Sequence, residues 1–471
     1  MERGVEVKLD RWGYEVRTSS DDCISAINSY YHQVLSYGRQ RRVILEAPGH
    51  DKDCVLANIL AAQFLYSSDP SRGPFHLIAA KSKLEQATSY EKAVFEAISS
   101  LICENRDDDV AVELHSKLLN DYPKDLISLK RAQLLCFYMG RPNQSLDLVQ
   151  KVLPHNKEED YVYGMLAFPL LELGRMPDAE EAARKGLKIN TQDYWAQHAV
   201  CHVLQYECRF KEAVEFMEAC SSSWNSCLSF MLTHNWWHVA LCYLEGHSSM
   251  QKVFEVYDHH IWNELERDDA TPAEVYINAL GLLLRVYVRD EIETFSDRLK
   301  VLASCVIDQT FWYLDWHLDV LILWALAKSG EISKAEELLK GLKDKFSKMS
   351  TKKQQIMQSG ILLAEAMFEY GKGNDKQALD ILGPGFDVNF CKIIGASDEQ
   401  LEVFSEVWYS MLLYTGQAHK AIEVLKKQIK KREGVPFIWR LLERGYSMAG
   451  KQKERGEAAD RAKTLENAYF V

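Results

Sequence analysis

Four histidines at matched spacing are the residues of this sequence whose chemistry is easiest to state. His234 and His238 lie four residues apart in HNWWH, and His198 and His202 have the same spacing in WAQHAVCH, 36 residues earlier. Residues four apart lie on one face of a helix, so each pair predicts two neighbouring imidazoles. Imidazole titrates near neutral pH and binds metal ions, so these side chains could act as acid–base groups, ligand contacts or metal ligands.

Three interpretations of these histidines are open. A structural histidine would pack between helices and bond a nearby carbonyl group, whereas a metal site would add Glu207 or Asp258 as an oxygen ligand. No HExxH motif is present, and the four rings need not converge, so we expect no cofactor. A metal ion bound by the four histidines stays as the alternative. The leading interpretation is acid–base chemistry or ligand binding in a cavity that limits water.

An arginine inside an apolar helix is the next candidate. Arg285 interrupts the run INALGLLLRVYV, and an arginine buried without a partner is strongly destabilising. We expect a carboxylate partner such as Asp258, with an anionic ligand as the alternative. Asp315 and His317, in LDWHLD, are two residues apart, so on a helix they do not face each other. They could still contact one shared ligand, or serve as a helix-capping acid and a core histidine.

The stretch GASDEQLEVF contains a predicted helix start. Ser397 and Gln400 have the spacing of a capping box, and a loop at the mouth of a groove is the alternative. The predicted site then combines catalytic and ligand-binding residues. The catalytic candidates are His198, His202, His234, His238 and His317, and the ligand-binding candidates are Glu207, Trp237, Asp258, Arg285, Asp315, Ser397 and Gln400.

Glycines at a regular interval divide the chain into repeats. Gly140 and Gly174 are 34 residues apart, and so are Gly416 and Gly450. Each follows an apolar helical run and precedes an alanine-bearing helix. This interval is the period of the tetratricopeptide unit, in which two helices are joined by a turn. Other turn glycines, such as Gly371, are spaced less regularly, so the array is expected to contain insertions.

We therefore predict an all-α fold of tetratricopeptide-like helix pairs in a right-handed superhelix, from about Ser19 to Leu465, with ends that can meet and close the groove into a pocket. In such arrays the first helix of each repeat lines the concave face, and both histidine pairs lie in first helices. We expect one domain over residues 1–471, an N-terminal extension over 1–18, and the clearest repeats at 125–190, 191–260, 311–345, 358–385 and 403–465.

A series of motifs runs along the chain: DRWG, YVYGMLAFPLLELGRMPDAEEA, HAVCHVLQYE, HNWWHVALCYLEG, YDHHI, LLLRVY, LDWH and GASDEQLEVF. Through these motifs the sequence resembles the tetratricopeptide repeat protein 38 family, as a plant- or bacterial-like member, over nearly its whole length. The resemblance implies the repeat fold and a site at the histidine pairs, but no particular reaction. Phe95 and Gln133 stand where the family usually has histidine, so the N-terminal half of that site is expected to be altered.

Composition and charge restrict the expected partners. The 471 residues carry a net charge of −12 and no basic stripe, so we expect no nucleic-acid partner. Eleven cysteines without a CxxC pair are typical of a reducing compartment. Because the sequence shows neither an apolar leader nor an apolar run of membrane length, we expect a cytoplasmic protein without a membrane contact.

The leading prediction of function is a soluble protein whose histidine-lined pocket binds a small polar or anionic ligand. If it is an enzyme, it would be a cofactor-independent lyase, isomerase or hydrolase that uses histidines. The alternative is an adaptor that binds a peptide or protein partner without catalysis, as many arrays of this repeat do. Peptide-binding arrays often present Lys and Arg on their first helices, whereas here the best-marked first helices carry His, Trp and Tyr, which favours the small ligand.

Overall fold

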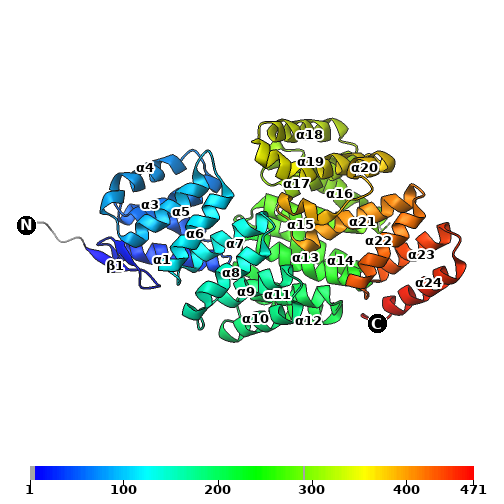
Figure 1. The fold of residues 1–471 in the computed structure, drawn as a ribbon, viewed down its shortest axis with the longest axis horizontal. Helices are drawn as coiled ribbons and strands as arrows, with labels where there is room; N and C mark the ends of the chain where they lie inside the picture. The colour runs from blue at the N-terminus through cyan, green and yellow to red at the C-terminus, as the bar shows by residue number, and fades with distance from the viewer. Residues whose placement is uncertain (1–5, 290–291, 471) are drawn as a thin grey trace, which may run out of the picture. The chain divides into compact units, whose positions relative to one another are not determined.

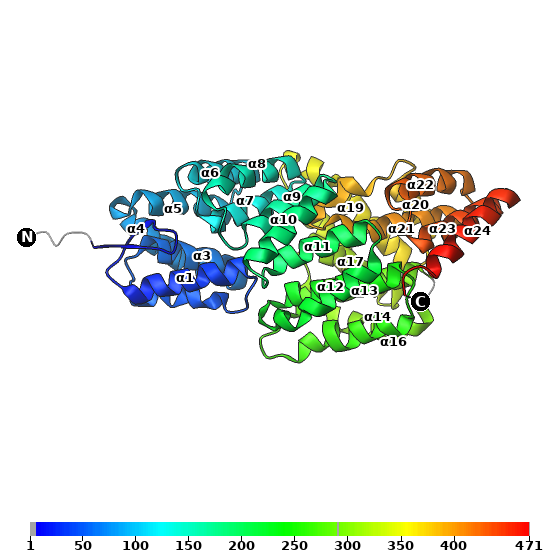
Figure 2. The ribbon, with the colours of Figure 1, turned by 90° about the horizontal axis from the view of Figure 1, so that it is seen from below.

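The structure, a computed structural model, describes residues 6–289 and 292–470 of the chain. The chain divides into two compact units, Met1–Val200 with Ser226–Leu228 (unit 1) and Cys201–Asn225 with Ser229–Val471 (unit 2). In both units the described elements are almost all helices (Figures 1 and 2), so the predicted all-α class is confirmed. The prediction of one continuous domain over residues 1–471 stays a prediction.

Unit 1 begins with a two-stranded hairpin and continues as a series of helices. In the segment predicted as an extension, β1 (Val7–Leu9) pairs antiparallel with β2 (Glu15–Arg17). Short 3-10 turns cover Arg41–Leu45, Leu84–Gln86 and Leu153–His155. The α-helices are α1 (Asp21–Leu35), α2 (Ala47–His50), α3 (Val55–Ser68), α4 (Gly73–Lys83), α5 (Ser89–Ile102), α6 (Asp108–Asp121), α7 (Leu126–Tyr138), α8 (Pro142–Val152), α9 (Val162–Glu172) and α10 (Met176–Ile189).

Helix α11 (Tyr194–Tyr206) begins in unit 1 and ends in unit 2. Unit 2 also has a π-helical turn at Tyr257–Ile261 and 3-10 turns at Ser221–Ser226, Trp262–Glu266, Gln309–Phe311 and Val388–Ile394. Its α-helices are α12 (Phe210–Cys220), α13 (Ser229–Glu245), α14 (Met250–Val256), α15 (Pro272–Val288), α16 (Ile292–Val306), α17 (Trp316–Lys328), α18 (Ile332–Ser347), α19 (Thr351–Gly371), α20 (Asp375–Leu382), α21 (Asp398–Tyr414), α22 (Ala418–Lys431), α23 (Pro436–Met448) and α24 (Gln452–Glu466).

Glycine ends the first helix of each repeat that the 34-residue interval predicts. Gly140, Gly174, Gly416 and Gly450 have φ angles between +64° and +81°, a left-handed conformation that other L-residues rarely adopt. They follow α7, α9, α21 and α23, each of which is the first helix of a pair. The interval therefore marks helix ends, as predicted.

Gly371 differs from the other predicted turn glycines. It is the last residue of α19, and the positive φ angle (+83°) belongs to Gly373 instead. A Cβ atom on Gly371 would lie 2.7 Å from both the Cβ atom of Ala327 and the backbone oxygen of Trp324 on α17. This glycine is therefore required by close helix packing and not by the turn.

The ranges predicted as repeats overlap helix pairs, and two of them begin inside a helix. They correspond to α7–α10 (125–190), α11–α14 (191–260), α17–α18 (311–345), α19–α20 (358–385) and α21–α24 (403–465). The pair α15–α16 has no marking glycine, yet α15 packs against α13, α16, α17 and α21. It is therefore a central element of unit 2, and it carries Arg285.

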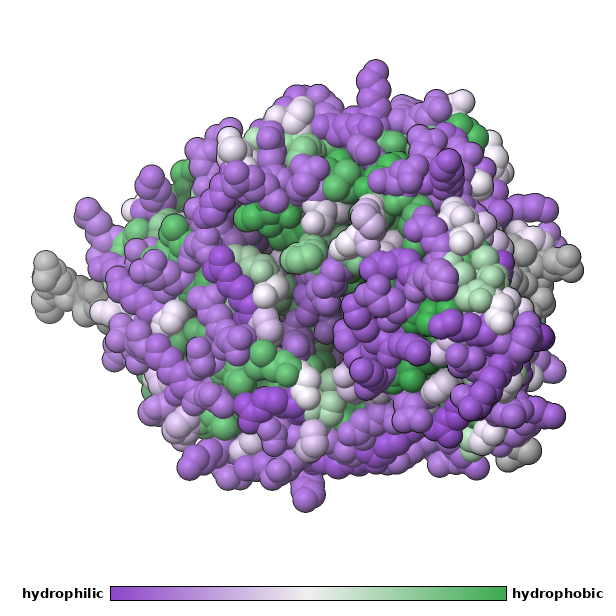
Figure 3. Space-filling model, turned by 45° about the vertical axis from the view of Figure 1, so that its right-hand side comes forward, coloured by the Kyte–Doolittle hydropathy of each residue, from purple (hydrophilic) through white to green (hydrophobic). Residues whose placement is uncertain are grey.

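The apolar residues of these helices are mostly inside. Trp237, Trp324 and Phe404 are among the largest fully buried side chains of unit 2. The face drawn in Figure 3 is mainly hydrophilic, with apolar residues in separate patches. Within the part of the chain that the structure describes, no helix combines the length and the apolarity that crossing a membrane requires.

Candidate functional site

Three of the predicted histidines meet inside unit 2. His202 lies on α11, and His234 and His238 lie one turn apart on α13. All three are buried, and one ring nitrogen from each lies within 4.8 Å of the others. The ring centroids of His202 and His238 are 4.4 Å apart, and those of His234 and His238 are 4.8 Å apart. The sequence-predicted groups therefore converge in this unit.

His198 stands one turn before His202 on α11, so the two imidazoles share one face of that helix. It is buried, and its ring stacks on Trp195 with a centroid separation of 4.9 Å.

Asn278 fixes which nitrogen of His234 carries the hydrogen. His234 Nδ1 lies 2.8 Å from Asn278 Oδ1, while Asn278 Nδ2 donates to the backbone oxygen of Glu274 at 3.1 Å. Because a carbonyl oxygen accepts only, the amide group cannot be turned round, and its oxygen faces the histidine. Nδ1 of His234 is therefore the donor, and the lone pair is on Nε2.

Gln205 does the same for His238. Its Oε1 lies 2.8 Å from His238 Nδ1, and its Nε2 donates to Glu245 Oε2 at 3.2 Å. A carboxylate accepts only, so the amide oxygen again faces the histidine. The lone pair of His238 is therefore also on Nε2.

Glu399 is the partner of His202. His202 Nδ1 lies 2.8 Å from Glu399 Oε1. Burial alone would raise the pKa of Glu399, but His202 outweighs burial and lowers this pKa to about 2, so the carboxylate is ionised at neutral pH. The carboxylate at 2.8 Å favours a hydrogen on Nδ1 of His202. For His234 and His238 an amide oxygen thus accepts the Nδ1 hydrogen, whereas Glu399 lies at ion-pair distance from Nδ1 of His202.

Burial keeps two histidines of unit 2 uncharged. It lowers the pKa of His234 to about 4, and it lowers the pKa of His317 to about 3, with His234 acting in the same direction on His317. At neutral pH neither ring offers a positive charge to an anion. This is the opposite of what an imidazolium-based anion site requires.

Buried ion pairs surround Arg285. Its Nη1 lies 3.5 Å from Glu406 Oε1 and 3.6 Å from Glu245 Oε1, and its Nη2 donates to the backbone oxygen of Glu399. The prediction of a carboxylate partner is confirmed, but the choice of Asp258 is wrong. Asp258 lies on the π-helical turn and pairs with Arg298 at 2.5 Å in a partly exposed contact.

The buried ion pairs form a network with a net negative charge. Arg432 contacts Glu245 and Glu402 at 2.7 Å each, and Arg289 contacts Glu406 at 2.7 Å. With the arginines and glutamates ionised and His202 counted as neutral, three cations and four anions give +3 − 4 = −1. The cations are Arg285, Arg289 and Arg432, and the anions are Glu245, Glu399, Glu402 and Glu406.

The remaining predicted residues have local roles. Asp315 caps α17, Ser397 and Gln400 form the predicted capping box of α21, and Glu207 pairs with Arg209 at 2.9 Å. Neither Glu207 nor Asp258 belongs to the group of histidine ligand atoms, so the predicted oxygen ligand is wrong. Trp237 does lie at the site, because its ring stacks on His234 with centroids 5.2 Å apart.

The groups that orient the histidines were not among the predicted residues. Asn278, Gln205 and Glu245 carry no local motif, and Glu399 lies inside GASDEQLEVF but looks like a first-turn acid. One signal was available for Gln205, which lies three residues after His202 and so on the same side of α11.

The two departures from the family pattern have structural roles in unit 1. Gln133 Nε2 donates to the backbone oxygen of Met165 at 2.8 Å and to Ser145 Oγ at 3.1 Å. Phe95 packs against the hydrophobic core of that unit. Glu91, kept from the family motif, accepts backbone N–H groups of Arg17, Leu56 and Thr88.

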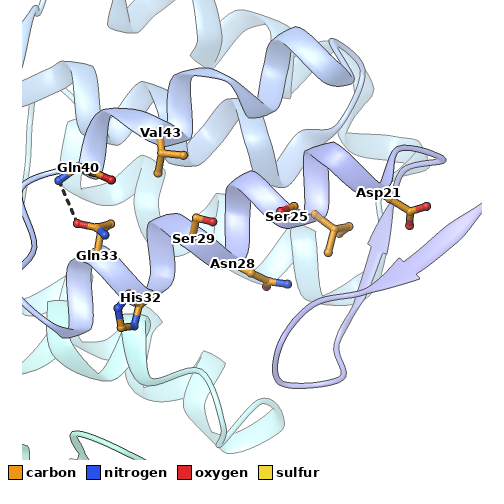
Figure 4. A pocket seen from close by; sticks show the side chains of 9 residues that line it. Asp21, Ser25, Asn28, Ser29, His32, Gln33, Gln40 and Val43 are labelled. Atoms are coloured by element: carbon orange, nitrogen blue, oxygen red, sulfur yellow. Dashed lines mark hydrogen bonds between the residues drawn. The ribbon is translucent and has the colours of Figure 1, made fainter.

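Unit 1 also has a polar groove along α1 with a volume of about 670 Å³. Figure 4 shows Ser25, Asn28, Ser29, His32 and Gln33 along it, with the backbone N–H of Gln40 donating to Gln33. None of the predicted site residues lines this groove.

No known family profile matches the chain. Solved structures similar to it include the human IFIT1 dimer with m7Gppp-AAAA, at 14% identity over 96% of this chain and 91% of that chain, with a TM-score of 0.38. The human IFIT1 dimer with PPP-AAAA shares 14% identity over 95% and 92%, with a TM-score of 0.41. Naa15/Naa10 bound to HypK-THB shares 13% identity over 81% and 64%, with a TM-score of 0.24.

The expectation of no nucleic-acid partner is withdrawn; the IFIT1 structures contain m7Gppp-AAAA or PPP-AAAA. The exclusion was based on the net charge of −12. Net charge is a sum over the whole chain and does not describe the potential inside one groove. The charge argument is therefore withdrawn.

Proposed function

We propose that this chain is a helical-repeat protein that binds a divalent transition-metal ion, with Zn²⁺ as the best-fitting ion, through His202, His234 and His238. The supporting observation is the common orientation of the three rings. Amide oxygens of Asn278 and Gln205 accept the Nδ1 hydrogens of His234 and His238, and Glu399 lies 2.8 Å from Nδ1 of His202, so we take Nε2 as the coordinating atom of each ring. Histidine ligands of metal ions are typically held in this way.

Charge supports a cation over an anion at this position. The buried ion-pair network carries −1, and His234 is neutral at neutral pH because burial lowers its pKa to about 4. Neutral imidazoles are good ligands for Zn²⁺ and poor partners for anions. The metal interpretation of the histidine pairs therefore ranks above the direct binding of an anion by imidazolium.

We also propose membership of the tetratricopeptide repeat protein 38 family, on the motifs of the sequence. A cytoplasmic location is supported by the eleven cysteines, all of which are free thiols in the structure.

Metal analysis tests the proposal. We expect protein dialysed against metal-free buffer to retain about one zinc ion per chain, measured by inductively coupled plasma mass spectrometry. His238→Ala removes a ligand and should weaken Zn²⁺ binding more than about 100-fold in a competition titration with a chromophoric chelator. Glu399→Gln keeps an acceptor but removes its charge, so we expect a loss of about 10-fold or more.

Two variants serve as controls. His259→Ala removes an exposed histidine of the π-helical turn, and Glu423→Gln removes an exposed carboxylate of α22 that pairs with Lys427. Both should bind Zn²⁺ like the unaltered protein. A purified protein without zinc that also takes up none on titration would contradict the proposal.

A further inference from the structure

Two buried donors beside the histidines lack an acceptor. In the described part of the chain, no group accepts a hydrogen bond from Trp237 Nε1 or from Arg285 Nε. Both side chains are almost completely buried. A buried donor without an acceptor is costly, so a site of this kind normally holds water or a ligand oxygen.

Trp237 links the histidines to Arg285. Its ring stacks on His234 at 5.2 Å, its edge meets His238 at 4.9 Å, and the guanidinium carbon of Arg285 lies 5.9 Å from its centroid. Trp237 thus contacts two of the proposed metal ligands and has the Arg285 guanidinium near its ring.

Beside the indole N–H there is room for an added carbon atom at one glycine. Gly281 lies one turn before Arg285 on α15, and a Cβ atom built on it would be 3.6 Å from Trp237 Nε1. Across the described residues, no other side chain or neighbouring backbone lies within 4 Å of that Cβ position, apart from the local backbone of α15 itself. Glycine therefore leaves room between α13 and α15 where the donors are found.

The charges indicate what fills this space. The buried ion-pair network carries −1, and a divalent metal ion would change the local sum to −1 + 2 = +1. A monoanion would then bring the site to neutrality, whereas without the metal an anion would enter a negative environment. The planar guanidinium and the indole N–H are both donors suited to carboxylate oxygens.

We infer that this space binds a small monocarboxylate, which accepts hydrogen bonds from Trp237 Nε1 and Arg285 beside the metal ion. The inference rests on the proposed metal site. It gives the predicted anionic ligand a chemical class, and it makes carboxylate binding conditional on metal loading.

Acetate is the probe for the test. The protein is labelled with ¹⁵N-tryptophan, loaded with Zn²⁺, and titrated with sodium acetate while the indole N–H signals are recorded by NMR. Trp237→Phe identifies the signal of Trp237. We expect this signal to move saturably, and we expect acetate to bind at least about 10-fold more weakly to metal-free protein, because a single charge contact is worth about that much.

Variants separate the carboxylate site from general effects. By isothermal titration calorimetry of Zn²⁺-loaded protein, Trp237→Phe keeps the aromatic ring but should weaken acetate about 10-fold. Gly281→Ala makes an ordinary contact with the indole nitrogen and fills the space, so it should weaken acetate at least as much. Trp236→Phe is the matched control, because Trp236 stacks on His260. This variant should bind acetate like the unaltered protein.

Metal content, measured on every sample, separates the two proposals. Protein that binds no Zn²⁺ contradicts the proposed function and removes the basis of the inference. Protein that holds Zn²⁺ but shows no Trp237 shift up to about 100 mM acetate overturns the inference alone, since its Kd would be weaker than about 0.1 M. Equal acetate binding with and without metal also overturns it.

Discussion

Buried histidines in this chain differ in what holds their Nδ1 hydrogen. His115, on α6, donates Nδ1–H to the backbone oxygen of Ala111 in its own helix at 2.7 Å, as a structural histidine does. His202 and His234 instead contact the side chains of Glu399 and Asn278, which belong to other helices. A side-chain acceptor from another helix fixes the ring direction at a defined place, which is the feature expected of a ligand-binding histidine.

His115 also makes the stability of the protein depend on pH. Burial lowers its folded-state pKa to about 4 from the usual 6.5, so as the pH falls the unfolded chain takes up this proton first. The stability that comes from burying the neutral ring is fully present above pH 6.5. Between pH 6.5 and pH 4 the free energy of unfolding falls by about 1.4 kcal/mol per pH unit. We expect the free energy of unfolding of the His115→Leu variant to fall less steeply with decreasing pH than that of the unaltered protein.

Unfolding midpoints measured by calorimetry at several pH values, with a metal chelator present, give the two slopes. The other titrating groups are common to both proteins, so the difference reports His115. Parallel slopes would mean that folding leaves the pKa of His115 unchanged.

At the scale of helices, the sequence predicts what local spacing determines. The interval between Gly140 and Gly174 predicts a helix pair because each left-handed turn needs glycine at the same place in the unit. The spacing of His234 and His238 predicts their shared face for the same reason, since three-and-four periodicity is local.

Contacts between distant helices could not be predicted in this way. Arg432 and Glu245 are 187 residues apart, yet their ion pair supports Gln205 and, through it, His238. No periodicity connects such positions, so the choice of Asp258 as the partner of Arg285 had no geometric basis. Gly371 shows the same limit, because only the approach of α17 explains why that position has no side chain.

Gly371 therefore gives a test of helix packing. In Gly371→Ala the new methyl group would lie 2.7 Å from Ala327 and from the backbone of Trp324, so the helices must separate. We expect a loss of about 1–3 kcal/mol in the free energy of unfolding, as for other overpacked sites. Thermal or urea unfolding measures it.

Gly456→Ala is the matched control, since a Cβ atom on this glycine of α24 meets nothing within 4 Å in the described structure. Alanine is the better helix former, so this change should stabilise the protein by up to about 1 kcal/mol. A neutral or stabilising Gly371→Ala would show that α17 and α19 can move apart without cost.

At the scale of the whole chain, the net charge predicts less about binding partners than the local arrangement of charges does. The net charge of the chain is −12, yet the ion-pair network of unit 2 contains three arginines. An adaptor function stays a prediction. The argument against it used only the residue types of the first helices that regular spacing marks.

The two compact units make the last prediction possible. His202, His234 and His238 all belong to unit 2, and each unit has a core of its own, so we expect the units to open separately. Zn²⁺ at about 100 times its Kd should stabilise the metal-bound unit by about 2.7 kcal/mol. Hydrogen exchange by mass spectrometry should therefore slow about 100-fold in α13 and α15. Peptides from α3–α5 in unit 1 are the internal control and should exchange at unchanged rates.

Equal slowing in both units would contradict separate opening. It would mean that the chain unfolds as one cooperative domain, which is what the sequence predicts for residues 1–471. Unchanged exchange in α13 with Zn²⁺ bound would have a different meaning, because the ion would then be held away from His234 and His238. The experiment thus tests the position of the metal and the domain organisation through different peptides of the same sample.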